Sequence, residues 1–497
     1  MKTISTFLAA LFFYANLIVN AQIVAPSKEW DARFGGISDD FLASIQQTID
    51  RGFIMGGFSE SGISGDKTEE NLGIEDFWVV KTDSNGIKQW DKRYGGDSYE
   101  ELFSLQLTND GGYILGGWST SGISGDKTQP SQGSGDYWIV KTDANGEIIW
   151  DKRFGGTEDD QLNQIHQTND EGYILGGWSY SGLGGDKTQA SQGGIDYWIV
   201  KIDANGIKQW DARFGGNSVD ILCSLQQTSD GGYILGGYSD SGNNGDKSQA
   251  SQGGRDYWIV KTDANGIKQW DARFGGLAYD WLSDIIQTYD QGYILGGWSS
   301  SGISGDKTQA SQGSDDYWIV KTDENGIKQW DARFGGSTHE NLNSLLQTDD
   351  GGYLLGGFSD SGIGGDKTQS CQGNQDFWII KTNATGTKQW DARFGGNESD
   401  WITSFQQIND GGYMLGGVSL SDISGDKTQP SQGSYDYWII KIAPDCFGLT
   451  AFSDSDSDGF GYAGNSLFVT NCAVPAGYVM DSTDCDDGNS LIFPNAK

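Results

Sequence analysis

Residues 228–237 read TSDGGYILGG, and residues 257–276 read YWIVKTDANGIKQWDARFGG. These two stretches contain three short strand-like runs, and a fourth run lies just upstream at residues 221–227. Asp-Gly and Asn-Gly pairs separate neighbouring runs, and they supply the positive φ angles that tight hairpin turns require. A loop of about 17 residues joins the two hairpins. The pattern therefore predicts a four-stranded antiparallel meander with two tight turns and one long loop.

This unit recurs without a change of register. Tryptophan recurs every sixty residues in two series, Trp30, Trp90, Trp150, Trp210, Trp270, Trp330 and Trp390, and Trp78, Trp138, Trp198, Trp258, Trp318, Trp378 and Trp438. A fixed period of this length, built from short strands, predicts an all-β fold, a seven-bladed β-propeller over residues 28–443. A β-helix could carry the same period, but its strands are parallel and lack paired hairpin turns. Large aromatic side chains on such sheets are expected to form the core.

The frame of the repeat predicts how the ring closes. The first copy of the WDARF strand, residues 30–34, has no partner upstream in the sequence. We expect it to complete the last blade beside residues 437–442, because joining the chain ends in one sheet removes open edges. The repeats resemble those of secreted bacterial propellers, including sixty-residue delta-type and quinoprotein-like blades, over about 410 residues. That resemblance implies the fold and carries no quinone site.

The N-terminus and the charge limit where the protein acts. Lys2, an apolar run at residues 7–19 and a small residue at Ala21 indicate a signal peptide over residues 1–21. The run is too short for a transmembrane helix, so we expect an exported or cell-surface protein, and a monomer. A net charge of −35 argues against nucleic acid and against docking on anionic lipid, since both need clustered Lys and Arg.

Several charged positions recur in every blade and belong to the face of the long loops. An acid just before the innermost strand is predicted to lie at the channel mouth, at Asp40, Glu100, Asp160, Asp220, Asp280, Glu340 and Asp400. A second set is the aspartate of Gly-Asp-Lys-Thr, at Asp66 and its six copies. Such a ring could hold a cation. Packing or loop capping is the simpler interpretation, because a ligand rarely has sevenfold symmetry. Asp31 and Arg33, on the outer strand, are expected to pair with each other or with a neighbouring blade.

Positions where the repeats differ on that face are better candidates for ligand binding. Tyr99, Tyr279, Trp281 and Trp401 appear there as possible contacts to a polysaccharide or protein partner, although sequence drift explains them equally well. The chain has only two histidines, His166 and His339, at different positions of the repeat, which leaves few ways to assemble a catalytic relay. A secreted carbohydrate-active enzyme remains the alternative, because the separation of carboxylates is not visible in a sequence.

The tail, residues 444–497, is predicted to be a separate metal-binding segment. Its candidate ligands are carboxylates, Asp454, Asp456, Asp458, Asp481, Asp484, Asp486 and Asp487. The order of acids and of Cys446, Cys472 and Cys485 resembles the MopE-type repeat of secreted bacterial proteins. Without histidine, carboxylate ligands favour calcium over copper, and a solvated acidic linker is the alternative. The three cysteines leave the disulfide pairing open. Proteins of this kind often continue into a sorting domain for type IX secretion, so the chain could be truncated.

Overall fold

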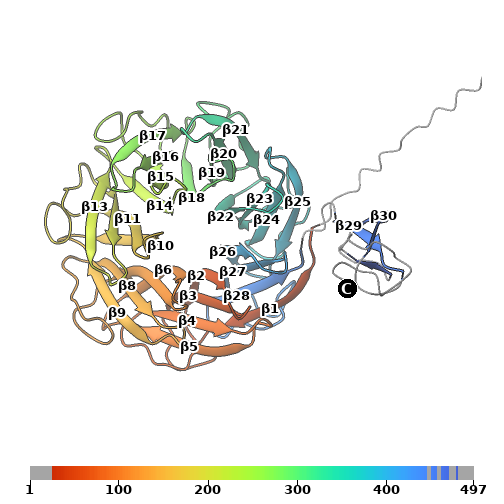
Figure 1. The fold of residues 1–497 in the computed structure, drawn as a ribbon, viewed down its shortest axis with the longest axis horizontal. Coiled ribbons are helices and arrows are strands. Elements are labelled where there is room, and N and C mark those ends of the chain that lie inside the picture. The colour runs from red at the N-terminus through yellow and green to blue at the C-terminus, as the bar shows by residue number, and fades with distance from the viewer. Residues whose placement is uncertain (1–24, 445–448, 456–460, 470–476, 480–497) are drawn as a thin grey trace, which may run out of the picture. The chain divides into compact units, whose positions relative to one another are not determined.

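The computed structural model describes residues 25–444, 449–455, 461–469 and 477–479. Seven four-stranded antiparallel sheets surround a common axis, with the first strand of each repeat innermost (Figure 1). This arrangement is a seven-bladed β-propeller, as the repeat predicts. All strand pairs within the blades are antiparallel, which rules out the β-helix. The propeller belongs to one compact unit, Ala25–Asp445.

The strands of the blades follow one another from the axis to the rim. Blade 1 contains β2(Asp40–Gln47), β3(Phe53–Ser59), β4(Asp76–Thr82) and β5(Lys88–Tyr94), and blade 2 contains β6(Glu100–Leu107), β7(Tyr113–Ser119), β8(Asp136–Thr142) and β9(Ile148–Phe154). Blade 3 contains β10(Asp160–Gln167), β11(Tyr173–Ser179), β12(Asp196–Ile202) and β13(Lys208–Phe214). Blade 4 contains β14(Asp220–Gln227), β15(Tyr233–Ser239), β16(Asp256–Thr262) and β17(Lys268–Phe274). Blade 5 contains β18(Asp280–Gln287), β19(Tyr293–Ser299), β20(Asp316–Thr322) and β21(Lys328–Phe334). Blade 6 contains β22(Glu340–Gln347), β23(Tyr353–Ser359), β24(Asp376–Thr382) and β25(Lys388–Phe394).

Blade 7 combines both ends of the propeller. It consists of β26(Asp400–Gln407), β27(Tyr413–Ser419), β28(Asp436–Ile442) and the N-terminal strand β1(Lys28–Phe34). In the antiparallel register, Trp30 lies opposite Lys441 and Phe34 lies opposite Tyr437. The predicted closure is confirmed, and β28 consequently has a partner on each side.

The two tryptophan series have different environments. Trp78 and its six copies on the third strands are fully buried, as expected of a propeller core. The Trp78 ring lies 4.8 Å from the ring of Tyr437 in the preceding blade, and the Tyr437 hydroxyl donates a hydrogen bond of 2.9 Å to the Trp78 carbonyl. The series that contains Trp30 is only half-buried, apart from Trp390. The predicted packing role is confirmed in part, because these six indoles pack against the core clusters while their strands form the outer edges of the blades.

Polar side chains connect the innermost strands around the axis. The Gln47 amide donates to Gln406 Oε1 at 2.8 Å, and the Leu107 amide donates to Gln46 Oε1 at 2.9 Å. These bonds use backbone groups that have no strand partner on the axial side. His166 replaces one of these glutamines beside an axial cavity of about 230 Å³, and burial lowers its pKa to about 4.

The strand order gives the propeller two distinct faces. The tight-turn face carries the two short hairpin turns of each repeat, such as residues 48–52 and 83–87 in blade 1. The long-loop face carries the loop between the second and third strands and the Phe-Gly-Gly connection to the next blade. A separate three-stranded sheet in the tail contains β29(Leu449–Ser453), β30(Tyr462–Val469) and β31(Tyr478–Val479). Among the described residues, no helix has the length and apolarity needed to cross a membrane.

Candidate binding surfaces on the two faces of the propeller

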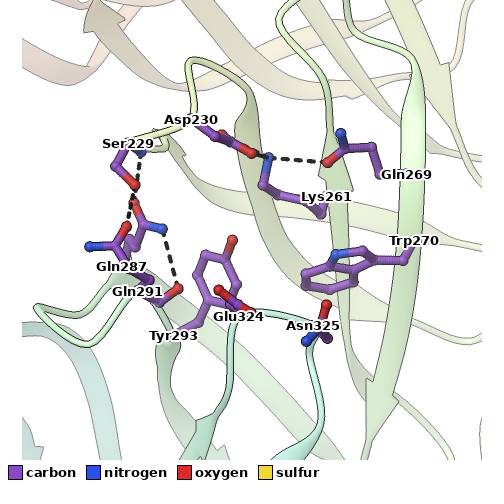
Figure 2. Close-up of a pocket in the computed structure, with 10 residues that line it drawn as sticks. All are labelled: Ser229, Asp230, Lys261, Gln269, Trp270, Gln287, Gln291, Tyr293, Glu324 and Asn325. Atoms are coloured by element: carbon purple, nitrogen blue, oxygen red, sulfur yellow. Dashed lines mark hydrogen bonds and ion pairs between the residues drawn. The ribbon is translucent and has the colours of Figure 1, made fainter.

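A pocket of about 550 Å³ lies between blades 4 and 5 on the tight-turn face. Its lining includes Asp230, Lys261 and Trp270 of blade 4 and Tyr293 and Asn325 of blade 5 (Figure 2). The volume is within the range of about 300 to 1,000 Å³ that is typical of small-molecule sites. Two neighbouring blades contribute to it, so their packing creates the pocket.

Equivalent residues form pockets at other blade junctions. A pocket of about 470 Å³ lies between blades 1 and 2, where Asp50, Lys81 and Trp90 face Tyr113. Another of about 470 Å³ lies between blades 7 and 1, where Phe53 replaces the tyrosine. The lysine and aspartate form an ion pair in all seven blades, with N–O distances of 2.6 to 2.9 Å. These pockets were not predicted from the sequence, where variation between the repeats indicated ligand binding on the long-loop face.

The recurring acids that were predicted to ring the channel mouth are instead buried inside the blades. Asp40, Glu100, Asp160, Asp220, Asp280, Glu340 and Asp400 are all 0% exposed. Asp40 Oδ2 accepts hydrogen bonds from the Gly36 amide at 2.7 Å and from the Ser61 hydroxyl at 3.1 Å. Burial raises the pKa of Asp40 despite these hydrogen bonds. The geometry is that of a loop cap, and these carboxylates present no open ring to a cation.

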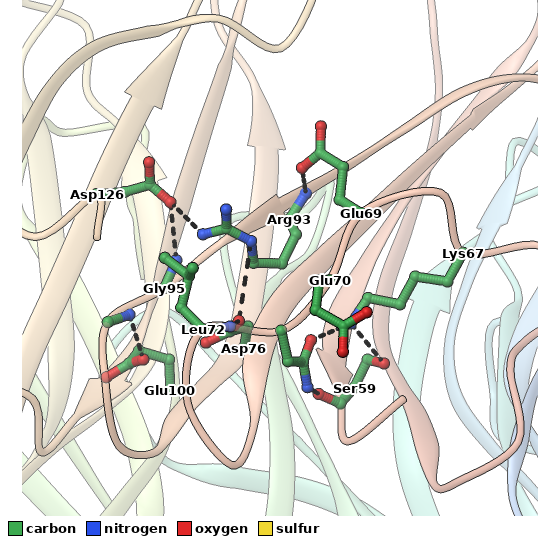
Figure 3. Close-up of polar contacts among 12 residues, drawn as sticks. Ser59, Lys67, Glu69, Glu70, Leu72, Asp76, Arg93, Gly95, Glu100 and Asp126 are labelled. Carbon is green, nitrogen blue, oxygen red and sulfur yellow. Dashed lines mark hydrogen bonds and ion pairs between the residues drawn. The ribbon is translucent and has the colours of Figure 1, made fainter. Parts of the chain in front are cut away.

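The Gly-Asp-Lys-Thr aspartates connect neighbouring blades. Arg93 of blade 1 lies 2.6 Å from Asp126 Oδ2 of blade 2 and 3.8 Å from Asp76 Oδ2 of its own blade (Figure 3). Asp126 also accepts a bond from the Gly95 amide. The same contact joins Arg33 to Asp66 across the closure of the ring. Arg33 thus pairs with a neighbouring blade, one of the two arrangements expected from the sequence.

The lysine of the same motif is buried within the long loop. Lys67 is 2% exposed, and its ammonium donates to Ser61 O at 2.6 Å and to Ser59 Oγ at 3.1 Å. Burial lowers the pKa of Lys67 to about 8. Nearby Asp76 is fully buried, and burial raises its pKa to about 7. These groups hold the long loop against the blade.

On the long-loop face, an arginine and several aromatic rings form a cluster between blades 4 and 5. The Arg255 guanidinium lies 5.0 Å from the ring centroids of both Tyr238 and Trp281. Trp281 is half-buried and also stacks on Trp298, with centroids 5.6 Å apart and an interplanar angle of 15°. Tyr279 is 56% exposed beside this group. We call Tyr238, Arg255, Tyr279, Trp281 and Trp298 the Arg255 cluster.

The other two candidates on this face are separate from the Arg255 cluster. Trp401 is half-buried, donates its indole N–H to Gln375 Oε1 at 2.5 Å and packs 5.2 Å from Tyr435. Tyr99 is 38% exposed. It forms a parallel β-bridge with Glu75, and this bridge joins blade 2 to blade 1. The structure therefore distributes the four sequence candidates over several blades rather than gathering them in one site.

Aromatic residues near the end of each second strand are partners that the sequence analysis missed. They are Phe58, Trp118, Trp178, Tyr238, Trp298 and Phe358, with Val418 in blade 7. Each lies opposite the second residue of the innermost strand, as Trp298 lies opposite Trp281. Their sixty-residue spacing was a visible signal of this aromatic ring.

Three glutamates meet where blades 1 and 2 adjoin on the same face. Burial, followed by the charges of Glu101 and Glu60, raises the pKa of Glu75 to about 7. Burial also raises the pKa of Glu101, and the two carboxyl groups lie close enough to share a proton. A shared proton is the expected response of two carboxylates forced together.

The remaining sequence candidates are only partly described. Asp454 is 8% exposed and its amide donates to Gly477 O at 2.9 Å. The other six acids predicted to bind metal, and Cys446, Cys472 and Cys485, lie outside the described residues. Cys223 and Cys371 are free thiols. His339 contacts Asp360 at 3.2 Å and lies far along the chain from His166.

These sheets and surfaces define a seven-bladed β-propeller with an elaborate inter-blade polar network. No family model matches the chain. The Regulatory protein FlaEY of Caulobacter vibrioides is 23% identical over 357 residues, which are 65% of this chain and 37% of that protein. The chain thus spans a little over a third of that curated relative.

The chain is also similar to several solved structures. Sqt1 from Chaetomium thermophilum has a TM-score of 0.43 and 11% identity, covering 84% of this chain and 100% of its own. The Pan2 WD40 domain of Neurospora crassa has a TM-score of 0.41 and 10% identity, covering 82% and 89%. Likeness at this level adds nothing on function, and the fold rests on the sheet topology.

Proposed function

We propose that this chain is an exported, non-catalytic binding propeller that docks a protein partner on its long-loop face. The observation that carries the proposal is the Arg255 cluster, where one exposed tyrosine, two stacked tryptophans and an arginine meet at a blade junction. Tryptophan, tyrosine and arginine are the residues most enriched at the energetic centres of protein interfaces. A polysaccharide on the same surface is the other outcome of the test.

The rigid scaffold supports this role. Asp240 Oδ1 lies 3.4 Å from Arg255 Nε, which orients the guanidinium over the aromatic rings. The ring of Tyr279 lies against Gly254, where an added Cβ would come within 2.6 Å of Tyr279 Cε1. Side chains held in this way lose little entropy when they bind.

The test compares two exposed tyrosines on opposite faces. A photo-crosslinking residue at position 279 is expected to give one adduct with a secreted or surface protein, whereas the same residue at Tyr289, on the tight-turn face, gives none. Arg255→Ala should remove the adduct while leaving the melting temperature within a few degrees. Equal labelling from both positions, or a polysaccharide adduct, would refute protein docking at the Arg255 cluster.

The enzyme alternative rests on the glutamates of blades 1 and 2. Glu75, with its pKa raised to about 7, could act as a general acid beside an ionised Glu101. However, carboxyl groups that share a proton are closer than the roughly 5.5 Å or more that glycosidases use. Hydrolysis assays on any bound glycan, repeated with Glu75→Gln, test this alternative. Turnover that disappears in that variant would favour the enzyme.

Calcium in the tail belongs to the same proposal. Three aspartates at alternate positions, Asp454, Asp456 and Asp458, are spaced as in loops that wrap a hard cation with oxygen ligands. Calcium would fix the tail's loops and leave the propeller unchanged. The resemblance of the tail to secreted MopE-type segments and the predicted signal peptide support export to the cell surface or beyond.

A further inference from the structure

The inter-blade pockets of the tight-turn face form a second kind of binding surface. In the pocket between blades 4 and 5, Trp270 is half-buried and its ring lies 5.8 Å from that of Tyr293 at an interplanar angle of 63°. Gly326, at φ +75°, approaches the indole so closely that an added Cβ would lie 2.7 Å from Trp270 Cζ3. The glycine turn therefore fixes the tryptophan, and the rest of the ring contributes to the pocket (Figure 2).

The tyrosine supplies an unused polar group. Tyr293 is 1% exposed, and no hydrogen bond of its hydroxyl is found among the described residues. The hydroxyl points into the pocket (Figure 2). Burial, together with the charges of Asp230 and Glu324, raises the pKa of Tyr293, so the hydroxyl keeps its proton. Because the hydroxyl faces the pocket, a ligand oxygen could accept its hydrogen bond in place of water.

The other polar groups are fixed in position. Lys261 Nζ lies 2.9 Å from Asp230 Oδ2 and 3.3 Å from Gln269 Oε1. Burial would raise the pKa of Asp230, but bonds from Thr228 and Lys261 outweigh it and hold that pKa below its usual value. Asp230 and Lys261 therefore carry opposite charges, and the pair as a whole has no net charge. Asn325 adds an amide on the opposite wall.

We propose that these pockets bind neutral saccharide units, one unit per pocket. A sugar ring has an apolar C–H face that can pack on the tryptophan, and hydroxyls that can exchange hydrogen bonds with Tyr293, Asn325 and the Lys261–Asp230 pair. In the pocket between blades 4 and 5 an anionic ligand is disfavoured, since Glu324 leaves that pocket with a negative charge. Ala144 stands at this position between blades 1 and 2, where the net charge of −35 on the chain is the remaining argument against an anion. A lipid is disfavoured in the pocket between blades 4 and 5, because polar side chains line most of it. The pocket between blades 1 and 2 is more apolar, with Ile49 and Leu107 in its lining.

The sequence predicts which junctions carry the tryptophan–tyrosine pair. Four of them also carry the asparagine, and Thr385 replaces it between blades 5 and 6. A half-buried tryptophan faces a tyrosine at five junctions, in the pairs Trp90–Tyr113, Trp150–Tyr173, Trp210–Tyr233, Trp270–Tyr293 and Trp330–Tyr353. The junction of blades 7 and 1 has Phe53 in place of tyrosine. At the junction of blades 6 and 7, Trp390 is 4% exposed, and blade 7 takes its fourth strand from the N-terminus instead of a hairpin.

Repetition suits a polymeric ligand. Sevenfold symmetry in the ligand is unnecessary, because each pocket can bind a separate residue of a polysaccharide or of a clustered glycan. Several weak sites on one rigid face raise the overall affinity by roughly 10²- to 10⁴-fold over a single site when the spacing permits simultaneous binding. The buried acids recur in every blade because they have a structural role. The recurrence of the inter-blade pockets, in contrast, is compatible with ligand binding.

The experiment uses the full chain and an array of neutral glycans, followed by calorimetry with the best-bound oligosaccharide. We expect about five sites per chain. Tyr293→Phe, a replacement that Phe53 already provides in blade 1, should reduce the count by one without lowering the melting temperature. Phenylalanine at all five tyrosines should weaken binding to the parent polysaccharide at least tenfold.

Tyr279→Ala on the long-loop face is the matched control and should leave glycan binding unchanged. Absence of binding to every neutral glycan would overturn the proposal. Undiminished binding by the fivefold variant would also overturn it, as would a stoichiometry of one. Loss of glycan binding in the Tyr279→Ala variant would show that the glycan binds on the long-loop face, and it would refute binding in the inter-blade pockets.

Discussion

Removing residues 25–34, and with them strand β1, should destabilise the whole propeller. The deletion exposes the edge of β28 and removes Phe34, which is 4% exposed, at a cost of about 3 to 5 kcal/mol. It also removes Asp31, which accepts the indole N–H of Trp438 at 3.1 Å. Leaving that donor unpaired costs about 1 to 3 kcal/mol more. A loss of roughly 4 to 8 kcal/mol compares with a total domain stability of about 5 to 15 kcal/mol.

Thermal unfolding followed by circular dichroism measures this loss, and size-exclusion chromatography measures the oligomeric state. We expect a fall of roughly 5 to 9 °C in melting temperature for a unit of this size, together with self-association through the unpaired edge of β28. Glu29→Gln is the matched control, because it makes β1 identical in sequence to β13. Its exposed ion pair with Lys441 should contribute less than about 1 kcal/mol. An unchanged melting temperature and monomeric elution after the deletion would refute closure through β1.

Four further predictions concern stability and metal. Burial raises the pKa of Asp76 to about 7 from 3.8, so the folded state holds the extra proton between these values and stability should fall as pH rises from 4 to 7. In urea titrations Asp76→Asn should lessen this slope without abolishing it, since the six equivalent aspartates have raised pKa values as well. Lys67 has a pKa of about 8 in the folded state, below its unfolded value of 10.5, so the unfolded state binds the extra proton and stability should rise again between pH 8 and 10. A stability profile that changes in one direction only from pH 4 to 10 would contradict the pKa shifts of Asp76 and Lys67. Gly95→Ala should lower the free energy of unfolding by more than about 3 kcal/mol, since the added Cβ would lie 2.0 Å from Asp76 Oδ1. Gly111→Ala is the control: its φ is +85° but the space around it is open, so the loss should be only about 1 kcal/mol. Calorimetry of the full chain should detect calcium binding that Asp454→Asn weakens, and the absence of heat at millimolar calcium would reject the metal segment.

Local sequence signals were sufficient for the fold. The Asp-Gly and Asn-Gly turns and the spacing of Trp78 and its copies determine the strands and the blade count, because hairpin turns and core packing are local or strictly repeated. The pairing of β1 with β28 also followed from the repeat frame. The half-burial of Trp30 did not, since exposure depends on whether a further strand covers the outer edge.

Contacts between blades were much harder to predict. Arg93 meets Asp126 across 33 residues, and Trp270 meets Tyr293 across a blade boundary. Such contacts depend on the relative placement of two sheets, which hydrophobic periodicity does not specify. The buried ring at Asp40 shows the same limit, because a recurrent acid looks alike in a sequence whether it caps a loop or lines a channel.

The most direct test of the central claim, a propeller that binds without catalysis, is the fate of the bound ligand. The purified chain is incubated with the glycan or protein that it retains, and the recovered ligand is analysed by mass spectrometry. The account predicts recovery of the intact ligand at its original mass after prolonged incubation. Fragments that accumulate with time, and that Glu75→Gln abolishes, would contradict it.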